Sequence, residues 1–148
     1  MVYAPYLNEL YEACKGKGAM LNGRSIHVSG KNDTQESVVS TGFPIDKDRN
    51  PDNNLDNLAR ILPMVRGVRR QGSAAFDLCC VAAGILDGYW EFNLHLWDVC
   101  AGILIVTEAG GTVRSFREDR NVPIVVGTPA IVEQLYPRLS DKPGKICL

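Results

Sequence analysis

The sequence has no long uninterrupted apolar run and no strong excess of one charge. Its apolar stretches are too short and too interrupted to cross a bilayer, which argues against a membrane protein. The net charge at pH 7 is -1, so the composition gives no reason to expect binding to nucleic acid or to an anionic membrane. The first residues lack a basic segment followed by an apolar one, and we therefore expect no secretory signal.

The sequence also lacks the cysteine and glycine patterns of several common sites. It has five cysteines, an odd number, and none are spaced as C-x-x-C, which argues against a disulfide framework and against a zinc or redox motif. We expect them to be reduced core thiols in a cytoplasmic protein. No phosphate loop, G-x-G-x-x-G fingerprint or G-x-S-x-G elbow is present. The two histidines, His27 and His95, share no metal-ligand spacing.

The sequence does have the composition of a globular domain. Its 148 residues are 45% hydrophobic and 22% charged, which suits one domain with a substantial core. In the second half, strand patterns alternate with helix patterns, which predicts an α/β fold with a partly parallel sheet covered by helices on both faces. We treat residues 1–148 as a single domain, with a hairpin region at 1–30 and an α/β region at 36–148.

The expected elements follow from hydrophobic period and from turn residues. Strands are expected at 2–4, 10–14, 25–29, 37–44, 65–71, 89–92, 112–116 and 123–127. Helices are expected at 55–62, from a cap at Ser73 through 74–88, and at 97–109, where Gly110 and Gly111 end the helix. A last helix begins at 128 or 129 and runs to 139, with Pro137 marking an early break. Asn22-Gly23 is a strong hairpin signal.

Three polar residues lie at ends of these elements: Ser73 and Asp98 at helix starts, and Glu91 at a strand end. In α/β sheets, ligands bind at the carboxyl ends of strands and near helix N-termini, so these residues are candidates for a site. Structural roles compete with this interpretation. Asp98 and Ser73 suit helix caps, and taken alone Asp98 favours a cap over a metal ligand. Glu91 suits an outward-facing strand position.

Other polar and aromatic residues receive plain structural interpretations. Arg69 and Arg70 are expected on a solvated face, Trp97 is expected as a core anchor, and Glu108 is expected at the surface. His95 is expected in a loop.

Three spaced segments resemble the inositol monophosphatase family. "WDVCAGILIVTEAGG" at 97–111 is similar to the family's C-terminal signature W-D-x-A-[AG]-G-x-x-[IL]-[IV]-x-E-A-G-G, with Cys100 in place of a small residue. "RRQGSAAFDLCCVAAGILDGYWE" at 69–91 resembles its R-x-x-G-[ST]-A-A segment, and "NELYEACKGKGAMLNGRSIHVS" at 8–29 resembles its hairpin. The three occur in the family's order and span most of the chain up to Gly111.

The resemblance implies a layered αβαβα fold of the sugar-phosphatase type and a magnesium-dependent phosphomonoesterase. Its substrate would be a small phosphorylated polyol or sugar such as inositol 1-phosphate, and the protein would be a homodimer. By motif match, Asp98 takes the position of a metal-binding aspartate. Glu91 matches the acidic residue that contacts substrate hydroxyls, and the loop Gly72, Ser73 and Ala74 matches the G-[ST]-A loop against the substrate. No catalytic residue is assigned.

Two further motifs of the family, a G-E pair and D-P-[IL]-D-G-T, carry its other metal ligands and have no counterpart here. The resemblance is therefore to the C-terminal half of the family fold. Mg²⁺ prefers about six oxygen ligands, so a single aspartate makes a poor site. We expect the chain to need an N-terminal half for catalysis. Two alternatives stay open: a non-catalytic half that acts as a binding or oligomerisation module, and a histidinol-phosphate phosphatase.

Overall fold

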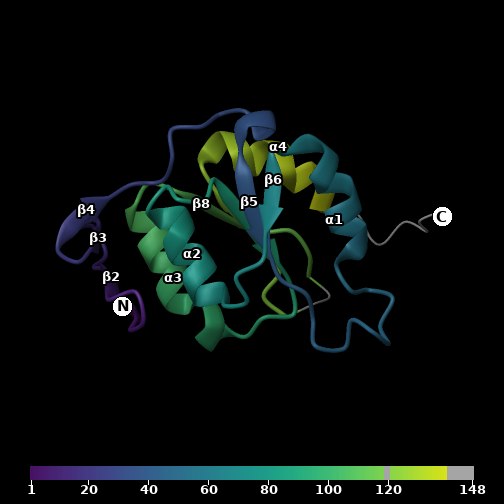
Figure 1. The fold of residues 1–148 in the computed structure, drawn as a ribbon, viewed down its shortest axis with the longest axis horizontal. Coiled ribbons are helices and arrows are strands. Elements are labelled where there is room, and N and C mark those ends of the chain that lie inside the picture. Colours follow the sequence, from purple (N-terminus) through teal and green to yellow (C-terminus); the bar gives the residue numbers. More distant parts are fainter. Residues whose placement is uncertain (119–120, 140–148) are drawn as a thin grey trace.

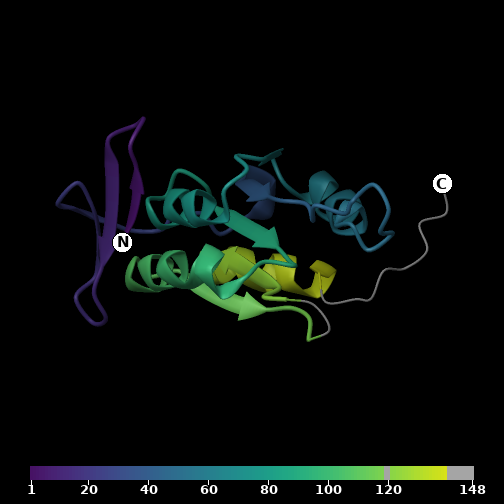
Figure 2. The same cartoon turned by 90° about the horizontal axis from the view of Figure 1, so that it is seen from below.

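A computed structural model describes residues 1–118 and 121–139 of the chain. Two sheets and two pairs of helices alternate along the long axis of the molecule (Figures 1 and 2). A small N-terminal sheet lies at one end and packs on helices α2 and α3, which cover one face of a larger sheet. Helices α1 and α4 cover its other face. The predicted α/β fold with helices on both faces is confirmed. Within the described ranges, no helix is long and apolar enough to cross a membrane.

The N-terminal sheet is an antiparallel meander of four strands in chain order. The strands are β1 (Val2–Ala4), β2 (Glu9–Ala13), β3 (Ala19–Leu21) and β4 (Arg24–Ile26). Strands β3 and β4 are joined by Asn22 and Gly23, whose φ angles of 49° and 77° give the primed turn that matches strand twist. The predicted hairpin is therefore confirmed.

The larger sheet has the order β6-β5-β7-β9-β8. Its strands are β5 (Val38–Thr41), β6 (Gly67–Arg69), β7 (Gly88–Glu91), β8 (Thr112–Ser115) and β9 (Ile124–Gly127). Strand β5 pairs in parallel with β6 and β7, whereas β9 pairs antiparallel with β7 and β8. The sheet is thus partly parallel, and the carboxyl ends of β5, β6 and β7 meet at one edge.

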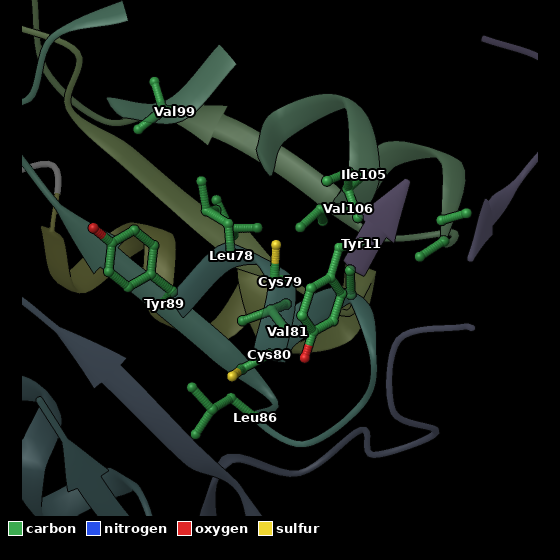
Figure 3. Packing of buried hydrophobic residues seen from close by; sticks show 14 of the residues in the cluster. Tyr11, Leu78, Cys79, Cys80, Val81, Leu86, Tyr89, Val99, Ile105 and Val106 are labelled. Carbon is green, nitrogen blue, oxygen red and sulfur yellow. The ribbon is translucent and has the colours of Figure 1, made fainter. Parts of the chain in front are cut away.

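Alternation along the strands builds a core on each face of this sheet. Tyr89 and Trp90 are both fully buried, yet they belong to different clusters because successive strand residues point to opposite faces. Tyr89 packs with residues of α2 and α3, including Leu78 and Val106, and Tyr11 of β2 joins the same cluster (Figure 3). Trp90 packs on the α1 and α4 side.

The remaining elements lie between these strands. They are the short 3-10 helices η1 (Thr34–Glu36) and η2 (Leu62–Met64) and the α-helices α1 (Leu55–Ile61), α2 (Ala74–Ala82), α3 (Leu96–Glu108) and α4 (Pro129–Leu139). Helix α3 ends where predicted, because Gly110 adopts a φ of 86° and the amide of Gly111 donates to the Val106 carbonyl.

Two details of the helix predictions are wrong. Helix α2 ends at Ala82 instead of continuing to 88, because Gly84 adopts a φ of 70° and the Ile85 amide donates to the Cys80 carbonyl, which closes the helix. Helix α4 ends at Leu139 as predicted, but it continues through Pro137 without the expected break. Pro137 lies on the exposed side, where the carbonyl four residues earlier can face water, while Leu135 and Leu139 are buried.

Two further expectations change in the structure. Cys79 and Cys80 are buried free thiols as expected, but Cys14 and Cys100 are exposed free thiols, and Cys147 lies outside the described residues. Glu108, expected at the surface, is half-buried and accepts hydrogen bonds from two backbone amides.

The Glu108 carboxylate joins the N-terminal sheet to α3. Its Oε1 accepts from the Gly16 amide at 2.8 Å and its Oε2 from the Gly18 amide at 2.9 Å. These two hydrogen bonds lower the pKa of Glu108.

Helices α2 and α3 approach closely at Gly102. A β-carbon there would lie 2.6 Å from Leu78 Cδ1 and 2.7 Å from Leu78 Cβ, so any side chain displaces α2. We expect Gly102→Val to lower the free energy of unfolding by about 2 kcal/mol, measured by urea denaturation. Cys100→Val, on the exposed side of the same helix, is the matched control and should cost well under half as much. Equal losses at the two positions would contradict this account.

Candidate functional site

A cavity of about 420 Å³ lies at the edge of the larger sheet where the parallel strands end and where α2 and α3 begin. Its walls come from the two residues after β5, the segment that leads from β6 into the start of α2, the end of β7 with the loop that follows it, and the start of α3. They are Gly42, Phe43, Arg70, Gly72, Ser73, Ala74, Ala75, Asp77, Glu91, Leu94, Trp97 and Asp98. Ligand sites of α/β proteins typically occupy this position, because strand ends and helix N-termini converge there.

All five residues singled out from the sequence line this one cavity: Asp98, Glu91, Gly72, Ser73 and Ala74. They come from three separate elements, and the packing of α2 against α3 brings them together. Their roles as metal and substrate ligands stay predictions, because the cavity gives their location and not their chemistry.

Asp98 lies in the first turn of α3 and is partly buried. Its Oδ2 accepts from the His95 amide at 2.8 Å, and its own amide donates to the His95 carbonyl at 3.0 Å. The capping role considered from the sequence is therefore present. The cap uses only Oδ2 of Asp98. Within the described residues, the other carboxylate oxygen, Oδ1, accepts no hydrogen bond. Asp98 can cap the helix with one oxygen and offer the other to a ligand.

Glu91 ends β7 and is partly buried against the cavity. Its Oε2 accepts from the Tyr89 hydroxyl at 2.5 Å. Burial raises the pKa of Glu91, and the hydrogen bond from Tyr89 works in the opposite direction. Asp77 raises this pKa further, whereas Arg70 lowers it.

The loop 72–74 leads into α2. Gly72 adopts a φ of 87°, a conformation that favours glycine. Ser73 is the residue before the helix, and its carbonyl accepts from the Asp77 amide at 2.9 Å, but its hydroxyl makes no capping hydrogen bond. The predicted cap is therefore only half right: Ser73 occupies the cap position, while its exposed hydroxyl remains available to a ligand.

Trp97, Arg70 and Asp77 are among the cavity-wall residues that sequence reasoning missed. Trp97, expected as a core anchor, is 76% exposed and stacks on His95 with ring centroids 4.3 Å apart. Arg70, expected on a solvated face, is exposed but lines the cavity. Asp77 lies in the first turn of α2, four residues after Ser73, and this spacing from the helix start could have identified it.

Asp77 is a buried carboxyl group. It is 2% exposed, its Oδ1 has no hydrogen-bond partner among the described residues, and burial raises its pKa to about 6. The unfolded chain loses this proton near the ordinary value of 3.8, so stability falls as the pH rises from about 4 to about 6.

We expect Asp77→Asn to relieve this cost. Relative to the parent, its free energy of unfolding should be higher by about 2 kcal/mol at pH 7.5 than at pH 4, because only the higher pH ionises the native carboxyl group. Urea denaturation over that pH range is the measurement, with the exposed Asp48→Asn as control. A difference that does not change with pH would show that Asp77 carries no raised pKa.

The described residues supply only part of a metal site. Within 1–118 and 121–139, no cluster of three or more histidine, cysteine, aspartate or glutamate residues is placed to hold a metal ion. The free Oδ1 of Asp98 is a suitable single oxygen ligand for magnesium, and the remaining ligands would have to come from water, substrate or other residues. A second cavity, of about 320 Å³, adjoins the first and shares Glu91 and Asp98 with it.

Comparisons with known proteins extend this picture. A sequence model described as the inositol monophosphatase family matches residues 1–142. An inositol-1-monophosphatase from Synechocystis sp. is 46% identical over 116 residues, which are 78% of this chain and 40% of that protein. A Nus factor SuhB from Pasteurella multocida is 39% identical over 150 residues, covering 96% of this chain and 56% of the relative.

Solved structures agree with the sequence comparisons. An inositol monophosphatase from Anabaena (Nostoc) sp. superposes with a TM-score of 0.88 at 37% identity, over 95% of this chain and 57% of that structure. An inositol monophosphatase from Thermotoga maritima gives 0.80 at 32% identity, over 93% of this chain and 53% of that one. The chain thus spans about half the length of the curated relatives it matches.

Proposed function

The chain belongs to the inositol monophosphatase family, and on that premise we propose that it is the substrate-binding part of a magnesium-dependent phosphomonoesterase. The substrate is a small polyol or sugar phosphate such as inositol 1-phosphate. The observation that carries the proposal is the convergence of Asp98, Glu91 and the 72–74 loop on one cavity at two helix N-termini. This arrangement suits an anionic ester with a hydroxylated leaving group.

Each group then has a defined task. Asp98 holds magnesium through the oxygen that the cap leaves free. Magnesium, when bound, neutralises phosphate charge and lowers the pKa of water. Glu91 accepts a hydrogen bond from a substrate hydroxyl, and the exposed Ser73 hydroxyl with the first amides of α2 faces the ester. Arg70 adds positive charge at the wall.

The incomplete metal site defines the rival hypothesis, a non-catalytic binding or oligomerisation module. The test is to assay the purified chain with inositol 1-phosphate and Mg²⁺, then to add an N-terminal half from a family relative that contains the G-E and D-P-[IL]-D-G-T motifs. Activity of the chain alone eliminates the rival. Activity only after addition restricts the function to the complex, and no activity in either case favours the module. Histidinol phosphate, assayed in parallel, separates the two substrate branches.

Three further assignments belong to the same proposal. We propose that residues 1–30 and 36–148 act as one domain, that the protein is a homodimer and that it works in the cytoplasm. The free Cys14 and Cys100 suit a reducing compartment. Light scattering tests the dimer, with an expected mass of twice 16.2 kDa for the purified chain.

A further inference from the structure

The Glu91 carboxylate is held in place from two sides. On one side the Tyr89 hydroxyl donates to Oε2 at 2.5 Å. On the other, the carboxylate lies directly against Gly42: a β-carbon at that position would be 2.1 Å from Oε1 and 2.2 Å from Oε2. No other residue of the described part of the chain forms a hydrogen bond to Glu91. The orientation of the Glu91 carboxylate therefore depends on the Tyr89 hydroxyl and on the absence of a side chain at Gly42.

The donor itself is rigid. Tyr89 is fully buried, and its ring packs beside Leu78 in the core cluster of α2 and α3. Figure 3 shows the Tyr89 hydroxyl directed away from the other labelled core residues. Because residues two apart in a strand share a face, Tyr89 and Glu91 both point to the α2 and α3 side, while Trp90 points to the other.

The direction of the hydrogen bond is also determined. Burial raises the pKa of Tyr89, so the phenol keeps its proton and acts as the donor. Oε2 of Glu91 is therefore occupied by an internal donor, and Oε1 remains as the acceptor for a ligand in the cavity.

We propose that Tyr89 is a positioning residue. Together with Gly42, which has no side chain, it holds the Glu91 carboxylate so that Oε1 is the single acceptor for a substrate hydroxyl. The consequence is selectivity for phosphate monoesters whose leaving group carries a hydroxyl donor, over esters without one. This inference rests on the proposed function, because it deepens the role of Glu91 there.

The test uses Tyr89→Phe in the active protein, which is the chain together with any N-terminal half that its activity requires. KM and kcat are measured for inositol 1-phosphate and for 4-nitrophenyl phosphate, whose leaving group has no free hydroxyl before cleavage. We expect the ratio of the two KM values to shift about tenfold against inositol 1-phosphate, the loss typical of one hydrogen bond to a charged group. An unchanged ratio overturns the inference.

A matched control exists in the N-terminal sheet. Tyr11 is also fully buried and donates to Glu9 Oε2 at 2.7 Å, two residues away on its own strand, but lines neither cavity. Tyr11→Phe should leave the KM ratio unchanged. In a Glu91→Ala background, Tyr89→Phe should add no further shift, because its effect passes through the carboxylate. If Tyr89→Phe shifts the KM ratio equally in the Glu91→Ala background, its effect does not pass through the carboxylate and the proposal is overturned.

Binding of free inositol separates this inference from the proposed function. The chain is titrated with inositol and followed by NMR chemical shifts, which need no catalysis. If no phosphatase activity is found but inositol binds, and binding weakens about tenfold in Tyr89→Phe, the positioning role stands while the catalytic proposal fails. If inositol binds equally to both variants, or to neither, the positioning role is wrong.

Discussion

Asp98→Asn is expected to lower kcat/KM for inositol 1-phosphate by two to three orders of magnitude, and to raise the Mg²⁺ concentration needed for half-maximal activity. The carboxamide oxygen of asparagine can still accept from the His95 amide, so the helix start keeps its cap. What disappears is the negative charge on the oxygen proposed to bind magnesium. Loss of a ligand that supports several kcal/mol of charge stabilisation corresponds to about this drop in rate.

The control for this variant is Asp33→Asn. Asp33 is also a cap, because its Oδ1 accepts from the Gln35 amide at 2.9 Å, but it lines neither cavity. Its Mg²⁺ dependence should stay that of the parent. If Asp98→Asn instead keeps the kcat/KM and the Mg²⁺ dependence of the parent, Asp98 is only a structural cap and the metal assignment is wrong.

Gly42→Ala is the second substitution with a large expected effect. The new β-carbon would overlap the Glu91 carboxylate, so Glu91 must leave its position beside Tyr89. We expect kcat/KM for inositol 1-phosphate to fall about a hundredfold, mostly through KM, because both the position and the orientation of the acceptor are lost. Steady-state kinetics with the two substrates used for Tyr89→Phe provide the measurement.

Gly30→Ala is the matched control for Gly42→Ala. A β-carbon at Gly30 meets nothing within 4 Å, and neither glycine has a positive φ, so only Gly42 carries the steric effect. Normal kinetics for Gly42→Ala would mean that Glu91 can move without consequence. That result would remove the role assigned to its orientation.

The local structure of most of the chain could be predicted from the sequence. Strand and helix identities followed from the period of apolar residues, and the Asn22-Gly23 turn and the Gly110 helix end followed from residues that tolerate positive φ. The predicted end of α2 and the predicted break of α4 at Pro137 are wrong. The end of α2 depends on where the chain must leave to reach β7, and the persistence of α4 depends on which side of it is buried. Both are decided by packing that local propensity does not contain.

The candidate site divides in the same way. Motif spacing was sufficient to select Asp98, Glu91 and the 72–74 loop, since each motif is a short continuous segment. The sequence did not reveal that Trp97 is exposed while Trp90 is buried, or that Glu108 binds the amides of Gly16 and Gly18. Those facts depend on segments far apart in the chain.

By itself, then, the sequence determined most of the elements, though not the short strand β3, and it determined the family resemblance and the identity of the polar groups at strand and helix ends. Only the tertiary structure decided which of those groups share a cavity, that Asp98 caps its helix with one oxygen and leaves the other free, and that Glu91 is held between Tyr89 and Gly42. The physical reason is that a side chain's partners, burial and pKa are set by neighbours brought together by packing, whereas the sequence lists only neighbours along the chain.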